Sequence, residues 1–436
     1  MRYRFQLALG AIAFTLSAPS ATTLSPAEQV IVRTVDAEQA RTLAMLEKWV
    51  NQNSGSLNIA GVTAVGQMLR SELEPLGFKV DWIDMKGAGR AGHIVARHVG
   101  SRTGKRLLLI GHLDTVFEPD SPFQRWTLEG DKAHGPGAGD DKGGMAVMVA
   151  ALRSMQAAGA LKQANITVFL TGDEEDAGSP LSISRRDLIA EGKKADAALD
   201  FEGLAVADGK DMGSIARRSA GSWTVTVTGK SAHSSGVGRA GTGYGAIYEL
   251  ARIIDQFRRE LPEDKLTFNV GLIGGGQTAV LDSGKIRLTA AGKTNIVAST
   301  AVARGDLRAI SQDQIDRVRA KMRAIVAQPL EGAKAEISFD EKGYPPMPPT
   351  GGNRALLGEL NSVNSDLGLP QMGELDPLER GAGDISFVAA DVDGLVGLGP
   401  ASYGDHTPNE TLELPSLTKQ AKRAAILMTR MAKERR

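Results

Sequence analysis

The spacing of apolar and polar residues predicts a sheet with helices on both of its faces in much of this chain. Residues 60–76 repeat apolar positions every three to four residues and end at Gly77, as a helix that covers a core does. Residues 107–110 and 166–170 are short continuous apolar runs, typical of strands buried on both faces. Strands at 78–83 and 93–99 and helices at 27–51, 145–155 and 354–368 are expected with them. This alternation predicts an α/β fold.

The pattern changes after residue 202. Residues 222–228 alternate strictly between apolar and polar, as in a strand with one solvated face. Further elements are expected as a helix at 246–258, strands at 266–273 and 285–291, and a helix at 312–327. The order strand, helix, strand, strand, helix predicts an inserted α+β unit with an antiparallel sheet, at about residues 216–330.

Composition narrows the possible chemistry. The 436 residues exceed one ordinary core, so two domains are expected, and 42% hydrophobic with 23% charged residues is ordinary for a globular enzyme. Lys plus Arg and Asp plus Glu both number 51, which argues against a general nucleic-acid-binding surface. Cysteine is absent, so a metal site would have to use histidine and carboxylate ligands.

Residues 1–21 have the features of a secretory signal peptide: a basic start, an apolar segment at 5–16 and small residues at 17–21. The apolar segment is short for a membrane span, and retention as an anchor is the alternative. We therefore expect a periplasmic or secreted protein without stable membrane association after signal removal.

Candidate metal ligands follow the expected strands. His112 and Asp114 lie at a strand's carboxyl end, where alternate residues face one side and the carboxylate can orient the imidazole. The glycine-rich segment 135–144 then brings Asp140 and Asp141 to the start of a helix. Phosphate binding is the alternative for such a turn, but the GxxxxGK[ST] pattern is absent.

Three later segments add acids and a histidine. Glu174 and Glu175 follow the strand at 166–170, and such adjacent acids can divide the roles of general base and metal ligand. Asp200 and Glu202 end another strand, and His406 lies in a late loop. Taken singly, each of these has an ordinary structural explanation as a solvated acid, a helix cap or a loop histidine.

Taken in order, the motifs HxD, GxxDxKGG, DEE, a strand-end acid and a late histidine resemble the M20 family of dinuclear zinc peptidases. The resemblance is greatest to its glutamate carboxypeptidase (carboxypeptidase G2-like) branch. It implies a zinc-exopeptidase catalytic domain of phosphorylase/hydrolase-like fold at 22–215 and 331–436, with a mixed sheet between helices. It also implies a ferredoxin-like dimerisation domain at 216–330, a homodimer and two zinc ions per subunit.

The resemblance assigns five metal ligands. His112 would bind one zinc ion, Asp140 would bridge both, and Glu175 would complete the other site, with Glu202 and His406 each binding one ion. Asp140 is favoured over Asp141 because the family spacing is acid-x-Lys-Gly-Gly. For the strand-end ligand Glu202 is favoured, with Asp200 as the alternative.

The same resemblance assigns catalytic and substrate-binding roles. Glu174 would be the general base, Asp114 would fix the His112 ring, and His233 would stabilise the oxyanion across the dimer. An unremarkable surface histidine is the alternative for His233. Substrate carboxylates would be held by Asn295, Arg308, Gly381 and Gly383. This chain has Ala298 where the family usually has proline, which weakens that part of the match.

The function implied is a zinc-dependent exopeptidase that releases a C-terminal amino acid, glutamate among the candidates, from a short peptide or N-acyl amino acid. A dipeptidase or aminoacylase-type amidohydrolase of the same family is the first alternative. A non-catalytic metal-dependent binding protein is the second, disfavoured because Glu174 and every expected ligand are present. A serine hydrolase is disfavoured because a suitable GxSxG motif is missing.

Overall fold

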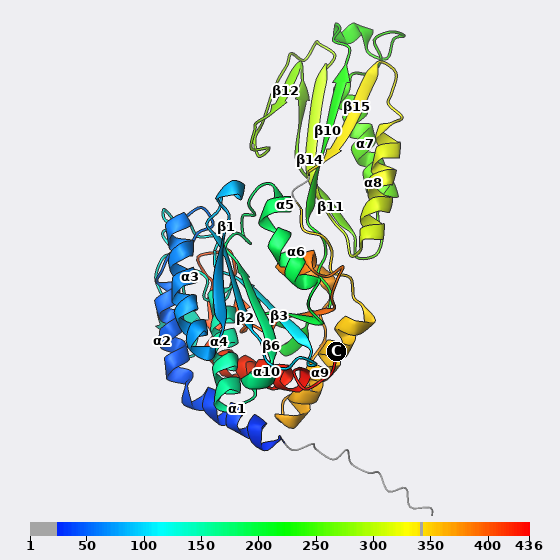
Figure 1. Ribbon diagram of the computed structural model, residues 1–436. Helices are drawn as coiled ribbons and strands as arrows, with labels where there is room; N and C mark the ends of the chain where they lie inside the picture. Colours follow the sequence, from blue (N-terminus) through cyan, green and yellow to red (C-terminus); the bar gives the residue numbers. More distant parts are fainter. Residues whose placement is uncertain (1–23, 341–342) are drawn as a thin grey trace, which may run out of the picture.

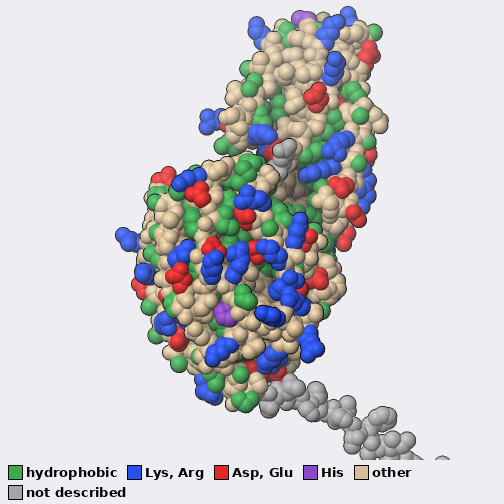
Figure 2. All heavy atoms as spheres, viewed as in Figure 1, with side chains coloured by type: hydrophobic (Ala, Val, Ile, Leu, Met, Phe, Trp, Pro, Cys, Tyr) green, Lys and Arg blue, Asp and Glu red, His purple; other side chains and the backbone are tan. Residues whose placement is uncertain are grey.

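The computed structural model describes residues 24–340 and 343–436, which form two lobes joined by a narrow connection (Figure 1). The predicted signal peptide at 1–21 lies outside the described residues. Within the described part of the chain, the helices are all too short or too polar to cross a bilayer. On the face in Figure 2, acidic and basic side chains are interspersed over both lobes.

The larger lobe is built on a six-stranded mixed sheet with the order β1-β2-β6-β3-β7-β17. Strands β3, β6, β7 and β17 run parallel, whereas β1 and β2 pair antiparallel at one edge. The strands are β1 (Lys79–Asp84), β2 (Gly92–His98), β3 (Arg106–His112), β6 (Asn165–Thr171), β7 (Ala197–Asp200) and β17 (Gly394–Val396). This arrangement confirms the predicted α/β class with a mixed sheet.

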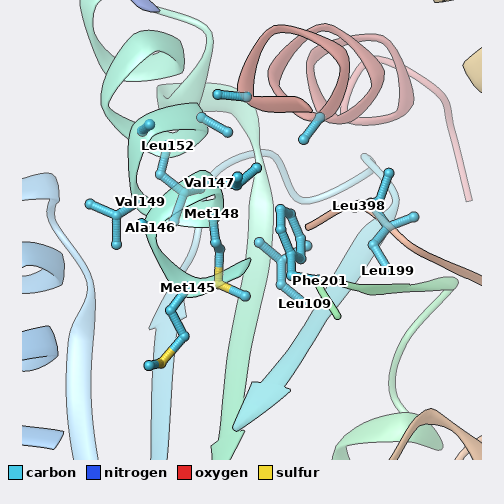
Figure 3. Close-up of a cluster of buried hydrophobic side chains, with 14 of the residues drawn as sticks. Leu109, Met145, Ala146, Val147, Met148, Val149, Leu152, Leu199, Phe201 and Leu398 are labelled. Atoms are coloured by element: carbon cyan, nitrogen blue, oxygen red, sulfur yellow. The ribbon is translucent and has the colours of Figure 1, made fainter. Parts of the chain in front are cut away.

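Side chains of β3 alternate between two cores. Leu107 and Leu109 belong to the large core under α4, whereas Leu108 and Ile110 pack into the core on the opposite face of the sheet. Figure 3 shows Met148 of α4 beside Leu109 and Phe201 in the large core. Burial on both faces explains why this strand is a continuous apolar run.

Helices enclose this sheet on both sides (Figure 1). The helices of this lobe are α1 (Pro26–Ala37), α2 (Gln39–Val50), α3 (Ile59–Leu73), α4 (Lys142–Ala157), α5 (Leu181–Ser184), α6 (Arg186–Gly192), α9 (Gly351–Asp366) and α10 (Leu414–Met431). The single helix expected at 27–51 is wrong, because the chain breaks at Glu38 into α1 and α2. The long helix α10, which packs against α4, had no counterpart in the sequence prediction.

Short strands complete the larger lobe. Two small sheets have the orders β18-β19-β5-β4 and β16-β9-β8. Their strands are β4 (Thr127–Glu129), β5 (Lys132–His134), β8 (Ala205–Ala207), β9 (Lys210–Gly213), β16 (Gly373–Glu374), β18 (Ser402–Tyr403) and β19 (Thr411–Glu413). Through β19 and β5, the loop that carries His406 is joined to the segment just before Asp140.

The smaller lobe is an antiparallel sheet with the order β11-β14-β10-β15, and it has its own core with α7 and α8. Its elements are β10 (Gly221–Gly229), α7 (Ala246–Glu260), β11 (Thr267–Gly276), β14 (Thr300–Arg308), α8 (Gln312–Val326) and β15 (Ala333–Phe339). Since the order along the chain is β-α-β-β-α-β, the topology is ferredoxin-like, in agreement with the predicted fold class.

Two strands of this inserted sheet were not anticipated from the sequence. Strand β14 lies between β10 and β11, and β15 lies past residue 330, where the insert was expected to end. The expected strand at 285–291 is shorter: β13 (Leu288–Ala291) pairs with β12 (Thr278–Leu281) in a separate ribbon. The predicted domain limits stay a prediction, but β15 extends the inserted sheet to Phe339.

Two antiparallel segments connect the lobes. Arg217 and Met347 exchange backbone hydrogen bonds of 2.9 Å, and Ala220 and Tyr344 do the same at 2.9 and 3.0 Å. Strand β10 starts directly after this connection.

Candidate metal centre and active site

The candidate site lies where parallel strands of the larger sheet end. His112 is the last residue of β3, Glu174 and Glu175 follow β6, and Glu202 follows β7. The carboxyl ends of neighbouring parallel strands meet at one edge of a sheet, which is where ligands bind in open α/β folds. The polar residues from His112 to Glu202, which are spread over 90 positions of the sequence, therefore lie in one region of the structure.

Four of the five predicted metal ligands converge. Ligand atoms of His112, Asp140 and Glu175 lie within 4.8 Å of one another. The His112 Nε2 atom lies 2.9 Å from Asp140 Oδ1, and His406 Nε2 lies 3.2 Å from both Asp140 Oδ2 and Glu175 Oε2. Asp140 thus places one oxygen against each histidine, so it would be the residue shared between two ions if both histidines bound metal.

The electrostatics of this cluster suit a cation. Burial raises the pKa of Glu175 to about 7 and, together with the nearby carboxylates, raises that of Glu174 well above its usual range. Hydrogen bonds to Asp140 and Glu175 raise the pKa of His406 to about 11. Acids crowded in this way are stabilised by a positive partner, and nitrogen and oxygen donors without thiolates suit zinc at a hydrolytic site. The residues present therefore fit the implied metal.

Asp114 joins the metal cluster to the loop that carries the two glutamates. Its Oδ1 accepts from the Glu174 N–H at 3.0 Å and lies 3.4 Å from His112 Nδ1. Its Oδ2 accepts from the Glu175 N–H at 3.1 Å and from the Ser56 hydroxyl at 2.6 Å. His112 Nδ1 lies nearer still, 3.1 Å, to the backbone carbonyl of Asp114. Asp114 thus positions the imidazole through its carbonyl and carboxylate and both glutamates through its carboxylate. The sequence analysis did not identify Ser56 as a partner of Asp114.

Glu410 was also missed by sequence reasoning. Its carboxylate accepts backbone N–H groups of Gly137, Gly139 and Asp140 at 3.2, 2.8 and 3.1 Å. These bonds fix the glycine-rich loop that presents Asp140. The sequence offered one indication of a role for Glu410, namely its position four residues after His406. No local pattern indicated that it contacts Asp140, which is 270 residues away.

Glu202 stands apart from the cluster. Its Oε2 accepts from Arg217 Nη1 at 2.5 Å, and its backbone N–H donates to Asp200 Oδ1 at 3.1 Å. Asp200 is buried, with Oδ2 3.6 Å from the same guanidinium, whereas Glu202 lines the pocket that also contains Asp140. The structure thus brings Glu202 to the pocket but leaves it paired with Arg217, a residue that was not predicted.

The loop that carries Glu174 is anchored by a buried network of three charged side chains, Asp173, Arg185 and Asp384. Arg185 donates to Asp173 Oδ1 at 2.6 Å and to Asp384 Oδ1 at 2.7 Å, and all three side chains are buried. The Tyr344 hydroxyl, from the connection between the lobes, donates to the Glu174 carbonyl at 2.6 Å. The connection therefore touches the candidate base directly.

The site opens into a pocket of about 390 Å³ lined by Glu174, Glu202 and His406 among others. Gly381 also lines it, and its carbonyl accepts from Arg217 Nε at 2.7 Å. Gly383 is buried against the ion pair, where a Cβ atom would lie 2.1 Å from Arg217 Nη1. Gly383 therefore leaves room for the Arg217–Glu202 pair.

The predicted residues of the inserted lobe lie at its two ends. The register of β10 with β14 places Gly221 opposite Leu307, so Arg308 is at the end next to the connection. Exposed His233 and Asn295 lie beyond the other end, where the Ser234 N–H donates to the Asn295 carbonyl at 2.9 Å. The nine residues of β10 separate these ends by about 30 Å at the rise of a strand.

The family model described as peptidase family M20/M25/M40 matches residues 108–430. The chain belongs to this family. The resemblance inferred from the motifs is confirmed, and M20 family members are peptidase hydrolases. The matched segment contains every candidate metal ligand.

Relatives of known name extend the M20 comparison. Carboxypeptidase G2 of Pseudomonas sp. strain RS-16 is 29% identical over 416 residues, 92% of both chains. Succinyl-diaminopimelate desuccinylase of Azoarcus sp. strain BH72 is 25% identical, over 86% of this chain and 94% of its own.

Solved structures share the fold. Aminopeptidase PepT of Bacillus cereus superposes with a TM-score of 0.71 at 18% identity, covering 91% of this chain and 99% of its own. The Bacillus subtilis YxeP protein, described as a dinuclear metal-binding peptidase of the M20 family, has a TM-score of 0.61 at 15% identity, with 90% and 98% covered.

Proposed function

We propose that this chain is a zinc-dependent exopeptidase that hydrolyses the amide bond before a C-terminal amino acid, glutamate among the candidates, in short peptides or N-acyl amino acids. The observation that carries the proposal is the convergence of His112, Asp140, Glu175 and His406 beside Glu174. The similarity to carboxypeptidase G2 over 92% of both chains supports this choice among M20 activities.

Five residues would hold two zinc ions: His112, Asp140, Glu175, Glu202 and His406. The ions would supply Lewis acidity for the scissile carbonyl and for the attacking water. Glu202 would serve as a ligand through its other oxygen, because Oε2 is paired with Arg217 Nη1. Arg217 is further held by the carbonyls of Gly381 and Ala382.

Glu174 would take the proton of the attacking water and pass it to the leaving amine. Glu174 lines the same pocket as Asp140 and His406, which suits a base that must reach the attacking water. Its backbone N–H is held by Asp114 and its carbonyl by Tyr344, so the peptide units on both sides of the residue are fixed. Asp114 would also keep the His112 ring in its ligating orientation.

His233 and Asn295 would act in the site of a second copy of the chain. Both lie at the far end of the inserted sheet, about 30 Å from its connection by strand length, whereas Arg308 lies at the near end. A homodimer would bring the partner's far end to this site, with His233 on the oxyanion and Asn295 on the substrate. Arg308, with the loop of Gly381 and Gly383, would bind the substrate's terminal carboxylate from the same chain.

A second candidate activity is removal of an acyl group from an N-acyl amino acid, or cleavage of a dipeptide, by the same site. The similarity to succinyl-diaminopimelate desuccinylase and to human carnosine dipeptidase 1 favours keeping it. Hydrolysis of N-acyl amino acids and dipeptides with varied C-terminal residues would separate the two. We also propose a periplasmic or secreted location, on the basis of residues 1–21.

Chelation should abolish hydrolysis, and zinc should restore it, because His112, Asp140 and Glu175 form a group of donors that would hold the metal on which the reaction depends. We expect about two metal ions per chain at saturation, as in two-metal hydrolases. Assays of the apo and reloaded protein, with elemental analysis, provide the measurement. Full activity of metal-free protein would contradict the proposal, as would saturation below two ions.

Glu202→Gln should lower metal content by about one ion per chain, whereas Asp200→Asn should leave it unchanged. The reason is that Glu202 lines the pocket and Asp200 is buried under it. Elemental analysis of the two purified variants, with thermal melting to verify folding, distinguishes these alternatives. Loss of metal from the Asp200 variant alone would reverse the assignment.

A further inference from the structure

Arg380 lies immediately before Gly381 and lines the pocket that contains Glu174, Glu202 and His406. Its side chain is only 14% exposed, and Nη2 donates to the Gly203 carbonyl at 2.6 Å. Its Nε–H is buried and meets no acceptor among the described residues. A buried donor without an acceptor is destabilising. A bound molecule can approach the partly exposed Arg380 side chain from the pocket and supply the missing acceptor once Nε is uncovered.

Arg217 is the other arginine that lines this pocket, and its guanidinium nitrogens already have acceptors. Its three nitrogens donate to the Glu202 carboxylate and to the carbonyls of Gly381 and Ala382. Glu202 is 2.5 Å from Arg217 but 3.7 Å from Arg380, so it is not a close partner for Arg380. If Glu202 binds zinc, its carboxylate is even less able to pair with Arg380.

We propose that Arg380 is a specificity-determining residue that binds a second carboxylate of the substrate, beyond the terminal carboxylate assigned to Arg308. The planar guanidinium fork matches a carboxylate and distinguishes it from an amide of the same shape. This second carboxylate belongs either to the side chain of the released amino acid or to the acyl group. The inference rests on the proposed hydrolase function and narrows its substrates to dicarboxylic compounds.

Four substrates test the inference in matched pairs. N-acetylglutamate and N-acetylglutamine differ only in the charge of the side chain, and N-succinylalanine and N-butyrylalanine differ in the acyl carboxylate. For zinc-loaded wild-type protein we expect kcat/KM to be at least about tenfold higher for one dicarboxylic compound than for its neutral partner, as for a charge-assisted hydrogen bond. The pair that shows the preference identifies which carboxylate is bound.

Arg380→Met should lower kcat/KM for the preferred dicarboxylic substrate by about 10- to 100-fold and for its neutral partner by less than about threefold. Arg380→Lys keeps the charge without the planar fork and should lie between. Arg354→Met is the matched control, because Arg354 is half exposed on α9 and pairs with Glu374; it should behave as wild type.

Equal preference of the wild type within both pairs would overturn the inference, and so would equal losses on charged and neutral substrates in the Arg380 variants. If Arg380→Met does not fold, the wild-type preference and Arg380→Lys decide the question. If the zinc-loaded wild type hydrolyses none of the four compounds and none of the dipeptides with varied C-terminal residues, the proposed function fails. In that case, calorimetry can measure the affinity of zinc-loaded wild-type protein for each compound. Equal affinities for the charged and neutral members of both pairs would contradict the role proposed for Arg380.

Discussion

Replacing Glu174 with alanine is expected to lower kcat by about 10²–10⁴-fold or more, the range for loss of a general base, while the protein keeps its metal. Glu174 lines the pocket but is outside the group of ligand atoms formed by His112, Asp140 and Glu175. Its removal should therefore affect proton transfer rather than metal binding. Steady-state kinetics and elemental analysis on the same preparation provide the measurement.

Glu175→Ala is the informative comparison, because Glu175 is adjacent in sequence yet has its carboxylate 3.2 Å from His406. This variant should lose metal occupancy, and its activity should fall as a consequence. Asp176→Ala is a control in the same loop, since Asp176 is exposed and pairs with Arg90. The assignment of the two glutamates is wrong if Glu174→Ala loses metal and Glu175→Ala retains it.

Mixing two inactive variants, His233→Ala and Glu174→Ala, should regenerate activity if His233 acts across a homodimer. In a mixed dimer the His233→Ala chain contributes its intact Glu174, and its partner lends the missing histidine. With random re-pairing of equal amounts, half of the dimers are mixed and each has one complete site, so activity should reach about a quarter of wild type. Activity after co-refolding provides the measurement.

The physical basis of this expectation is the length of the inserted sheet. His233 lies beyond the end of β10 that is remote from the connection, and it is exposed, with Ser235 as its hydrogen-bond partner at 2.9 Å. Each variant refolded alone is the control, and light scattering with a tagged copy verifies subunit exchange. If exchange is demonstrated and the mixture remains inactive, His233 does not complete the site of a neighbouring chain.

Sequence patterns predicted most of the larger lobe because local burial determines them. The apolar run that became β3 is buried on both faces, and His112, Glu174, Glu175 and Glu202 lie at or just after the ends of strands. Asp140 lies in the glycine-rich loop before α4, and His406 lies in a late loop.

The strands β14 and β15 were missed, although β14 pairs with both β10 and β11. The core positions of β14 are mostly alanine and it contains Gly305, so its hydrophobic signal is weak. In β15 the residues Ala333, Ala335, Ile337 and Phe339 alternate with polar ones and pack on the core, so its pattern was present in the sequence but lay beyond the expected end of the insert.

The sequence by itself determined the α/β class, the absence of thiolate chemistry and the candidate residues, since each depends on residue identity and local spacing. Tertiary structure alone decided which of these residues meet. His406 reaches Asp140 across 266 positions, Arg217 pairs with Glu202, and His233 is held far from Arg308 by the register of one sheet. Such contacts depend on strand order and packing, which no short-range pattern along the chain encodes.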